Sequence, residues 1–159
     1  MRKVVLTSLA VGAAIMFAAD ARAQGPMMYG SEINLDSAKK AVAAAAAEAK
    51  KNNWPLAISV VGPSGDLVYF ERMDGTQFAS IKISQHKARA AATYRRPTKV
   101  FAELISKGGT ALLTLDDVIA SPGGIPIVQG GKVIGAIGCS GATGDQDAQA
   151  CQVGVDAVK

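Results

Sequence analysis

The sequence predicts an α/β domain of the α+β type, with a central antiparallel sheet of about five strands and helices packed on it. Two pairs of short apolar segments are each joined by a glycine-containing turn, which is the pattern of a β-hairpin. Segments of helical periodicity precede, separate and follow the two hairpins. Because hairpins join antiparallel neighbours, this order favours an antiparallel sheet over a parallel βαβ fold.

The second hairpin is the stretch around which the predicted fold is organised. It lies within Gly123 to Gly141, with strands expected at 125–128 and 132–138 and a turn at 129–131. The second strand alternates β-branched residues with glycine or alanine. Such small positions mark a close approach by another backbone or by a flat ligand. A helix of the same chain, a second subunit and a cofactor all remain candidates for that neighbour.

The first 23 residues have the pattern of an export signal. Two basic residues precede an apolar run at 4–19, and Ala21–Ala23 is a small-x-small cleavage site. The apolar run is shorter than the about 20 residues of a membrane-spanning helix. We therefore expect a mature chain that begins at Gln24, lies in the periplasm or outside the cell, and has no membrane anchor.

Residues 24–33 have neither a helical nor a strand period, and we expect a flexible or draped N-terminal arm. The domain proper is expected at 34–159. Asn34 is a candidate N-cap for a first helix whose apolar residues recur at steps of three and four. That helix should end near residues 52–53, because Pro55 disfavours helical backbone at the residue before it. Strands are expected at 56–61 and 67–72.

The segment 79–94 is predicted to be a helix with two apolar sides. A helix of this kind is usually covered on both sides. The sheet would cover one side, and a second subunit is the candidate for the other, so the sequence predicts a homo-oligomer. His86, the only histidine, falls at the edge of one apolar line. The two lines are Ile83, Ala90 and Tyr94, and Ile81, Ala88 and Ala92.

The remaining elements follow a break at 95–97. Thr98 is a candidate cap for a helix that ends at Gly108-Gly109. Residues 112–119 fit either a strand or a short helix. Asp145 or Asp147 is expected to start the last helix. The predicted buried side of that helix comprises Ala148, Cys151, Val155 and Val158.

Charge and cysteine content limit the possible partners. Removal of the predicted signal lowers the formal net charge from +4 to +2, and no basic run suggests a nucleic-acid partner. Cys139 and Cys151 would meet an oxidising compartment, where a helix packed on the strand could bring them into a disulfide. The alternative is two buried thiols. A metal site is disfavoured by the absence of a CxxC motif and by the single histidine.

Most catalytic motifs are missing. The Gly138–Gly141 sequence does not match a nucleophile elbow, and a serine nucleophile would need a base beside it. The glycine pairs lack the spacing of nucleotide-binding loops. The clustered aspartates, at 116–117 and at 145 and 147, are typical of helix caps rather than of metal ligands.

His86 and its basic neighbours supply the parts of a haem site. A histidine nitrogen can ligate iron, alanines and isoleucines can line an apolar slot, and cations can bind the carboxylates of the macrocycle. An isolated histidine on a helix is nevertheless more often a structural or surface residue. The cations in question are Lys82, Lys87, Arg89, Arg95 and Arg96.

Several short motifs together resemble one family. They are Arg72-Met73-Asp74-Gly75, Lys87-Ala88 with Pro97-Thr98 ten residues on, Gly123-Gly124-Ile125-Pro126-Ile127, Gly135-Ala136-Ile137-Gly138, Ser140-Gly141 and Asp147. In this order and spacing they make residues 34–159 similar to the GlcG/HbpS-like family of haem-binding or haem-degrading proteins. That family includes the C-terminal domain of PduO-type cobalamin adenosyltransferases.

The resemblance implies an α/β domain with a central antiparallel sheet, assembly into dimers or larger oligomers, and in some members binding of haem or a corrinoid. Members are also found exported. Two residues depart from the family pattern. Gly62 stands where an aspartate is usual, which puts in doubt a role for a carboxylate at that turn. Cys139 stands where a valine is usual, which fits a bridge to Cys151.

We therefore predict an exported haem- or tetrapyrrole-binding protein. The haem iron is expected to be ligated by His86, or failing that by Tyr94 or Met73, and the propionates to be held by Lys87, Arg95 or Arg96. One alternative is a small-metabolite enzyme that uses backbone N–H groups of Gly123–Pro126 and Ser140-Gly141. Another is a non-catalytic oligomeric sensor partner. The sequence does not decide whether the protein is an enzyme.

Overall fold

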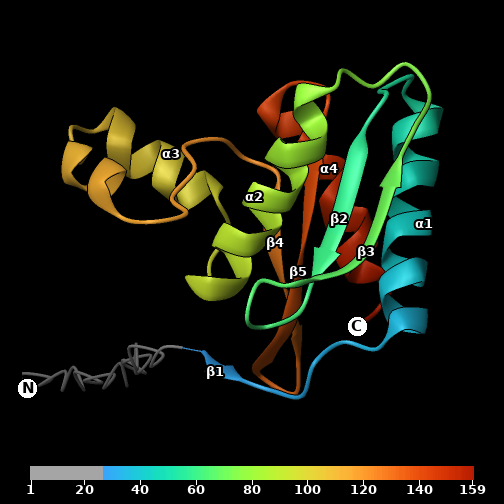
Figure 1. The fold of residues 1–159 in the computed structure, drawn as a ribbon, viewed down its shortest axis with the longest axis horizontal. Helices are drawn as coiled ribbons and strands as arrows, with labels where there is room; N and C mark the ends of the chain where they lie inside the picture. The colour runs from blue at the N-terminus through green and yellow to red at the C-terminus, as the bar shows by residue number, and fades with distance from the viewer. Residues whose placement is uncertain (1–26) are drawn as a thin grey trace, which may run out of the picture.

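The computed structural model describes residues 27–159, so the predicted signal at 1–23 lies outside the described residues. The chain forms two β-hairpins that are separated by helices, with one long helix before the first hairpin and one after the second (Figure 1). The elements are β1 (Met28–Tyr29), α1 (Leu35–Lys51), β2 (Ala57–Val61), β3 (Leu67–Arg72), α2 (Ala79–Thr93), α3 (Lys99–Ser106), the 3-10 helix η1 (Thr110–Thr114), β4 (Gly124–Gln129), β5 (Lys132–Ser140) and α4 (Gly144–Asp156).

β5 is the centre of a five-stranded sheet. It pairs antiparallel with β4 along one edge and with β2 along the other, and β2 pairs antiparallel with β3. β1 pairs in parallel with the start of β5, so the sheet is mixed. The prediction of a wholly antiparallel sheet is therefore wrong for β1. Most of the domain separates β1 from β5 in the chain, and therefore no hairpin fixes their relative direction.

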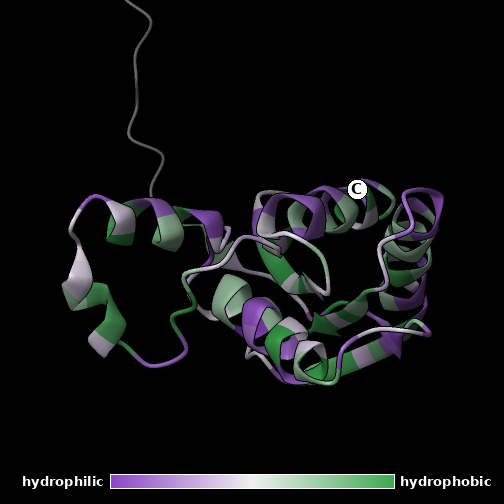
Figure 2. Ribbon diagram, turned by 90° about the horizontal axis from the view of Figure 1, so that it is seen from above, coloured by the Kyte–Doolittle hydropathy of each residue, from purple (hydrophilic) through white to green (hydrophobic). Residues whose placement is uncertain are grey.

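Helices cover both faces of the sheet, with α2 on one face and α1 and α4 on the other (Figures 1 and 2). Neighbouring residues of β5 show the two faces, because side chains alternate along a strand. Gly138 faces α2, whereas Cys139 is joined to α4. The larger apolar core lies under α1 and α4 and includes Leu56, Ile58 and Ile137.

α2 lies unusually close to the sheet because the residues between them are small. A Cβ on Gly138 would collide with the carbonyl oxygen of Ser84 and lie 2.5 Å from the amide nitrogen of Ala88. The neighbour that the glycines of this hairpin were expected to admit is therefore a helix of the same chain. The small core cluster between α2 and the sheet comprises Val61, Ala88, Ala91, Ala92 and Ala136.

The two apolar sides of α2 are each covered in part. The alanines of both sides, Ala88, Ala90 and Ala92, are fully buried, whereas the larger residues Ile81, Ile83 and Tyr94 are only half-buried. Both sides are thus partly open in the single chain. A second subunit as the cover of one side stays a prediction.

The N-cap of α1 is the residue predicted from the sequence, whereas the N-cap of α4 is a different residue. Asn34 caps α1 as predicted, with its Oδ1 accepting from the Ser37 N–H at 2.8 Å. α4 is capped by Thr143 in a capping box with Gln146, rather than by Asp145 or Asp147. The threonine hydroxyl takes the cap position, which leaves the carboxylate of Asp147 available for a partner inside the domain.

α3 and η1 form an arm that projects from the body (Figure 1). The segment 112–119, which fitted either a strand or a helix, thus contains the end of a 3-10 helix and no strand. Three leucines of this arm, Leu104, Leu113 and Leu115, are exposed, Leu113 by 60%. Within residues 27–159 no helix is both long and apolar enough to cross a membrane.

Candidate functional site

Two adjacent residues of α2, His86 and Lys87, place their side chains in different environments. Lys87 is buried and His86 is half-buried. Consecutive residues on a helix are separated by about 100° around its axis, which allows one to enter the core while its neighbour faces away from it. The polar groups around these two residues form an internal cluster and an outer hollow.

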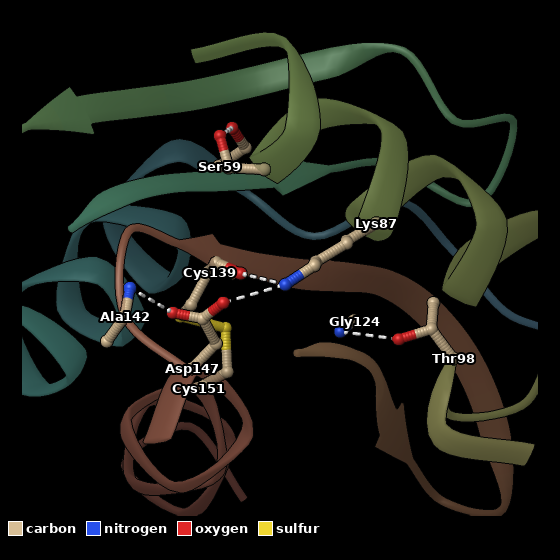
Figure 3. Close-up of a disulfide and its surroundings, with 9 residues drawn as sticks. Ser59, Lys87, Thr98, Gly124, Cys139, Ala142, Asp147 and Cys151 are labelled. Atoms are coloured by element: carbon tan, nitrogen blue, oxygen red, sulfur yellow. Dashed lines mark hydrogen bonds and ion pairs between the residues drawn. A yellow bond between two sulfur atoms is a disulfide. The ribbon is translucent and has the colours of Figure 1, made fainter. Parts of the chain in front are cut away.

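The internal cluster is centred on the Lys87 ammonium group (Figure 3). Its Nζ lies 2.7 Å from Oδ2 of Asp147 and donates to the carbonyl oxygen of Cys139 at 3.1 Å. The side chains of Lys87 and Asp147 are only 2% and 3% exposed. The other carboxylate oxygen of Asp147 accepts from the Ala142 N–H at 3.0 Å. A buried charge pair of this kind is tolerated because further hydrogen bonds satisfy its remaining atoms.

Burial raises the pKa of the Asp147 carboxyl above its ordinary value of 3.8. The hydrogen bond and the positive charge of Lys87 act in the opposite direction, as do the N–H groups of Ala142 and Gly141. Lys87 therefore offsets part of the effect that burial has on the pKa of this carboxyl.

Gly123 and Gly124 fit around the same cluster. A Cβ on Gly123 would lie 3.0 Å from Nζ of Lys87 and 2.9 Å from Cβ of Asp147. The Gly124 N–H donates to Oγ1 of Thr98, whose own N–H donates to the Gly124 carbonyl oxygen, both at 3.0 Å. The hydroxyl of Thr98 then donates to the Ser121 carbonyl oxygen. The motif residues around Gly123 thus have structural roles.

The Cys139–Cys151 disulfide is present and confirms the predicted bridge. The two Cα atoms are 5.8 Å apart, which lies within the usual range for a disulfide. It joins β5 to α4 directly beneath the ion pair (Figure 3). The disulfide therefore links β5 to α4, and the buried salt bridge links α2 to α4.

Two of the backbone donors expected to form an enzyme site are bonded inside the domain. The Gly124 N–H is taken by Thr98, and the Gly141 N–H donates to Asp147. Pro126 has no N–H. The anion- or carbonyl-binding site predicted at Gly123–Pro126 and Ser140-Gly141 stays a prediction.

The outer hollow surrounds His86. It has a volume of about 160 Å³ and is lined by Lys82, Gln85, His86, Arg89 and Asp117. The Nε2 atom of His86 is buried and has no hydrogen-bond partner among the described residues. The nearest carboxylate oxygen, Oδ1 of Asp117, lies 3.9 Å away, which exceeds hydrogen-bond length. A buried nitrogen without a partner is unusual in a folded protein and calls for a ligand or a functional role.

The cations around His86 come from its own helix. Lys82 and Arg89 precede and follow it by four and three residues, so they lie on the same helical face. Asp117 reaches the hollow from the loop after η1 and has a positive φ of 60°. The sequence placed Lys82 and Arg89 near His86, but Asp117 was interpreted only as a helix cap. Its contact with α2 depends on the path of the loop.

Tyr94, Arg95 and Arg96 lie about two turns of helix beyond His86, a distance of roughly 12 Å along the axis. The Tyr94 hydroxyl donates to the Asp116 carbonyl oxygen at 2.6 Å, and its ring packs edge-on against Phe101. The guanidinium group of Arg95 stacks on Tyr29 and donates to the Met27 carbonyl oxygen. That of Arg96 lies 6.0 Å from the Phe101 ring centroid.

The predicted ligand set is thus divided among several places. Lys87 is inside the domain, where it binds an internal carboxylate rather than a propionate. Met73 packs against the core under α1, on the face of the sheet away from α2. Only His86 among the predicted residues enters the outer hollow, together with the two cations of its own face. No group of three or more His, Cys, Asp or Glu in residues 27–159 could hold a metal ion.

The fold and these clusters define a class of protein: a small α/β domain with a buried ion pair inside it and a surface on α2 that carries a histidine beside two cations. A family model described as haem degrading protein HbpS-like matches residues 33–156. The chain belongs to this HbpS-like family.

Individual relatives agree with this assignment. The chain is 44% identical to protein GlcG of Escherichia coli (strain K12) over 99 residues, which are 62% of this chain and 74% of GlcG. The crystal structure of a double mutant of Streptomyces reticuli HbpS matches with a TM-score of 0.76 at 25% identity, covering 97% of this chain and 99% of that one. The PduOC:Heme complex shares the fold, with a TM-score of 0.73 at 22% identity over 80% of this chain and 96% of that one.

The departure at Gly62 has a structural counterpart. A Cβ at this position would collide with the carboxylate of Glu32, whose side chain lies over the glycine. A carboxylate from the segment before α1 therefore lies over this turn. Sequence reasoning missed this because the two residues are far apart in the chain.

We predict that Lys87→Met lowers the free energy of unfolding by about 3–5 kcal/mol, because it leaves the Asp147 carboxylate buried without a counter-ion. Urea denaturation followed by circular dichroism measures this change. The matched control is Lys82→Met, an exposed lysine of the same helix, for which we expect a change within about 0.5 kcal/mol. Equal stability of the two variants would show that the ion pair is dispensable.

Proposed function

We propose that this protein binds haem or a related tetrapyrrole, with Nε2 of His86 as the ligand to iron. The observation that carries the proposal is that this nitrogen is buried and unbonded beside two cations. A neutral imidazole nitrogen is the commonest protein ligand for transition metals. When bound, haem would supply the iron chemistry, and the protein would bind and orient it.

The relatives support a tetrapyrrole over other ligands. The matching family is described as haem degrading, and the PduOC structure of the same fold is a complex with haem. The residues of this chain fit such a ligand, since Lys82 and Arg89 provide cations for carboxylates on the same face as the histidine. Arg95 and Arg96 remain candidates for a propionate that extends toward the end of α2. Tyr94 could reach iron only after leaving Asp116.

We further propose that the functional unit is a homo-oligomer. A hollow of about 160 Å³ is below the 300–1,000 Å³ typical of small-molecule pockets, so one chain cannot enclose a macrocycle there. The half-buried Ile81, Ile83 and Tyr94 of α2 and the exposed leucines of the projecting arm offer apolar surface that a second copy can cover. A second copy seated there would complete the walls of the hollow.

Export is also part of the proposal. The pattern of residues 1–23 fits a cleaved signal, and a disulfide between the two cysteines of the chain suits an oxidising compartment. In that setting the protein would bind haem outside the cytoplasm.

We expect the mature protein to shift the Soret band of added hemin, and His86→Ala to remove that spectrum and weaken binding by about tenfold or more. Absorbance titration of wild type and variant measures both effects. Gln85→Ala, the preceding residue in the same hollow, is the matched control and should retain the wild-type spectrum. An unchanged spectrum in His86→Ala would remove the ligand assignment, and no shift in wild type would remove the haem proposal.

For the oligomer, we expect Leu113→Asp to dissociate the assembly, because it places a charge on the apolar surface of the arm. Light scattering at micromolar concentration gives the mass. Leu67→Asp is the control, since Leu67 is exposed to a comparable extent, 51%, but lies on β3 away from the arm. A monomeric wild type, or an assembly that survives Leu113→Asp, would contradict the proposed interface.

For export, expression of the full chain in a Gram-negative bacterium should yield periplasmic protein whose N-terminal residue is Gln24. N-terminal sequencing of the fractionated protein tests this directly. Ala23→Arg, which changes the residue before the predicted cut, should block processing, while Ala14→Leu within the apolar run should not. A cytoplasmic product that keeps residues 1–23 would refute the export signal.

A further inference from the structure

We propose that the Cys139–Cys151 disulfide and the Lys87–Asp147 ion pair act as one redox-sensitive latch that holds α4 against β5 and α2. The disulfide holds α4 in the position that the ion pair requires, and the ion pair holds α4 in the position that the disulfide requires. A dithiol reductant that opens the disulfide would therefore also loosen the ion pair and release the start of α4. This inference is independent of haem binding.

The latch rests on the arrangement of four residues. Cys139 of β5 contributes its sulfur to the disulfide and its carbonyl oxygen to the Lys87 ammonium group. On α4, Cys151 follows Asp147 by four residues, which is about one turn of helix. The covalent bond and the charged contact thus lie on the same face of α4 and meet the same residue of β5. A shift of α4 away from β5 would strain both.

Burial makes the two contacts depend on each other. Cys139 and Cys151 are both 0% exposed, so a thiolate can reach a sulfur atom only after α4 has moved off the sheet. Thiol–disulfide exchange requires direct attack on one sulfur, and its rate depends on access to that atom. The Lys87–Asp147 pair opposes this movement, since opening would separate two charges that are already desolvated.

The dithiol reductant supplies the electrons and protons that reduction of the disulfide consumes. One thiolate of the dithiol attacks a sulfur of the disulfide, which breaks the S–S bond and forms a mixed disulfide. The second thiol then closes the dithiol into a cyclic disulfide and releases the second cysteine as a thiol. Two electrons and two protons pass from the dithiol to Cys139 and Cys151.

Opening the latch would change a second hollow. A cavity of about 330 Å³ lies between the first turns of α4, including Ala148 and Gln149, and the start of β4 at Gly123-Gly124. α4 forms one wall of this cavity, and the latch fixes that wall to the sheet. Reduction would therefore widen the cavity. The disulfide links the redox state of the compartment to access at this edge of the domain.

The test is the rate at which excess dithiothreitol reduces the native protein, followed by trapping of the new thiols and mass spectrometry. Asp147→Asn keeps the size of the side chain and removes the charge, and we expect reduction about tenfold faster than in wild type. Asp145→Asn is the matched control, because Asp145 is an exposed acidic residue of the same helical turn. We expect the control to react at the wild-type rate.

A second measurement needs no variant. Hydrogen exchange of the oxidised and reduced wild-type protein should show faster exchange in reduced protein at the Ala142 N–H, which donates to Asp147, and through the first turns of α4. We expect an increase of about tenfold or more at these amides and none in β3. Equal reduction rates for Asp147→Asn and wild type, or exchange at α4 that reduction leaves unchanged, would each overturn the latch.

Discussion

The burial of one ammonium group constrains the rest of this structure. A lysine inside a small domain is costly unless a counter-charge and hydrogen bonds meet it, and Asp147 and the Cys139 carbonyl oxygen supply them. Their positions require α2, β5 and α4 to meet at one point. Gly123 is part of the same requirement, since a side chain there would enter the space that the ammonium group occupies.

The second constraint is the short distance between α2 and the sheet. Glycine and alanine on both surfaces allow it, and buried hydroxyl pairs bridge it, between Ser59 and Ser84 at 2.8 Å and between Ser80 and Ser140 at 3.1 Å. This interface therefore gains less from apolar area than the core under α1 and α4 does. It relies on complementary polar contacts, which specify the seating of α2 more narrowly than apolar packing alone.

The sequence was sufficient for contacts that depend on local geometry. Glycines at a turn and Asn34 before a periodic segment each predict one structure, and two cysteines on a strand and a following helix made a disulfide one of two expected outcomes. It was insufficient where distant segments meet. Lys87 and Asp147 are 60 residues apart, and Glu32 and Gly62 lie in different segments. Lys87 was expected at a ligand because lysines are mostly exposed, and the buried exception depends on its counter-charge.

The buried contacts inside the domain explain several of the motifs that carry the family resemblance. Lys87 and Asp147 form a buried ion pair, Thr98 and Gly124 bond to each other, and Gly123 packs beside the ion pair, so these residues maintain the fold. The ligand proposed here is held by residues outside those motifs. His86 is one of these residues, and the inward anchoring of Lys87 fixes the rotation of α2 and thereby sets the direction of the adjacent imidazole. The buried ion pair is thus a positioning element for the outer surface on which binding is proposed.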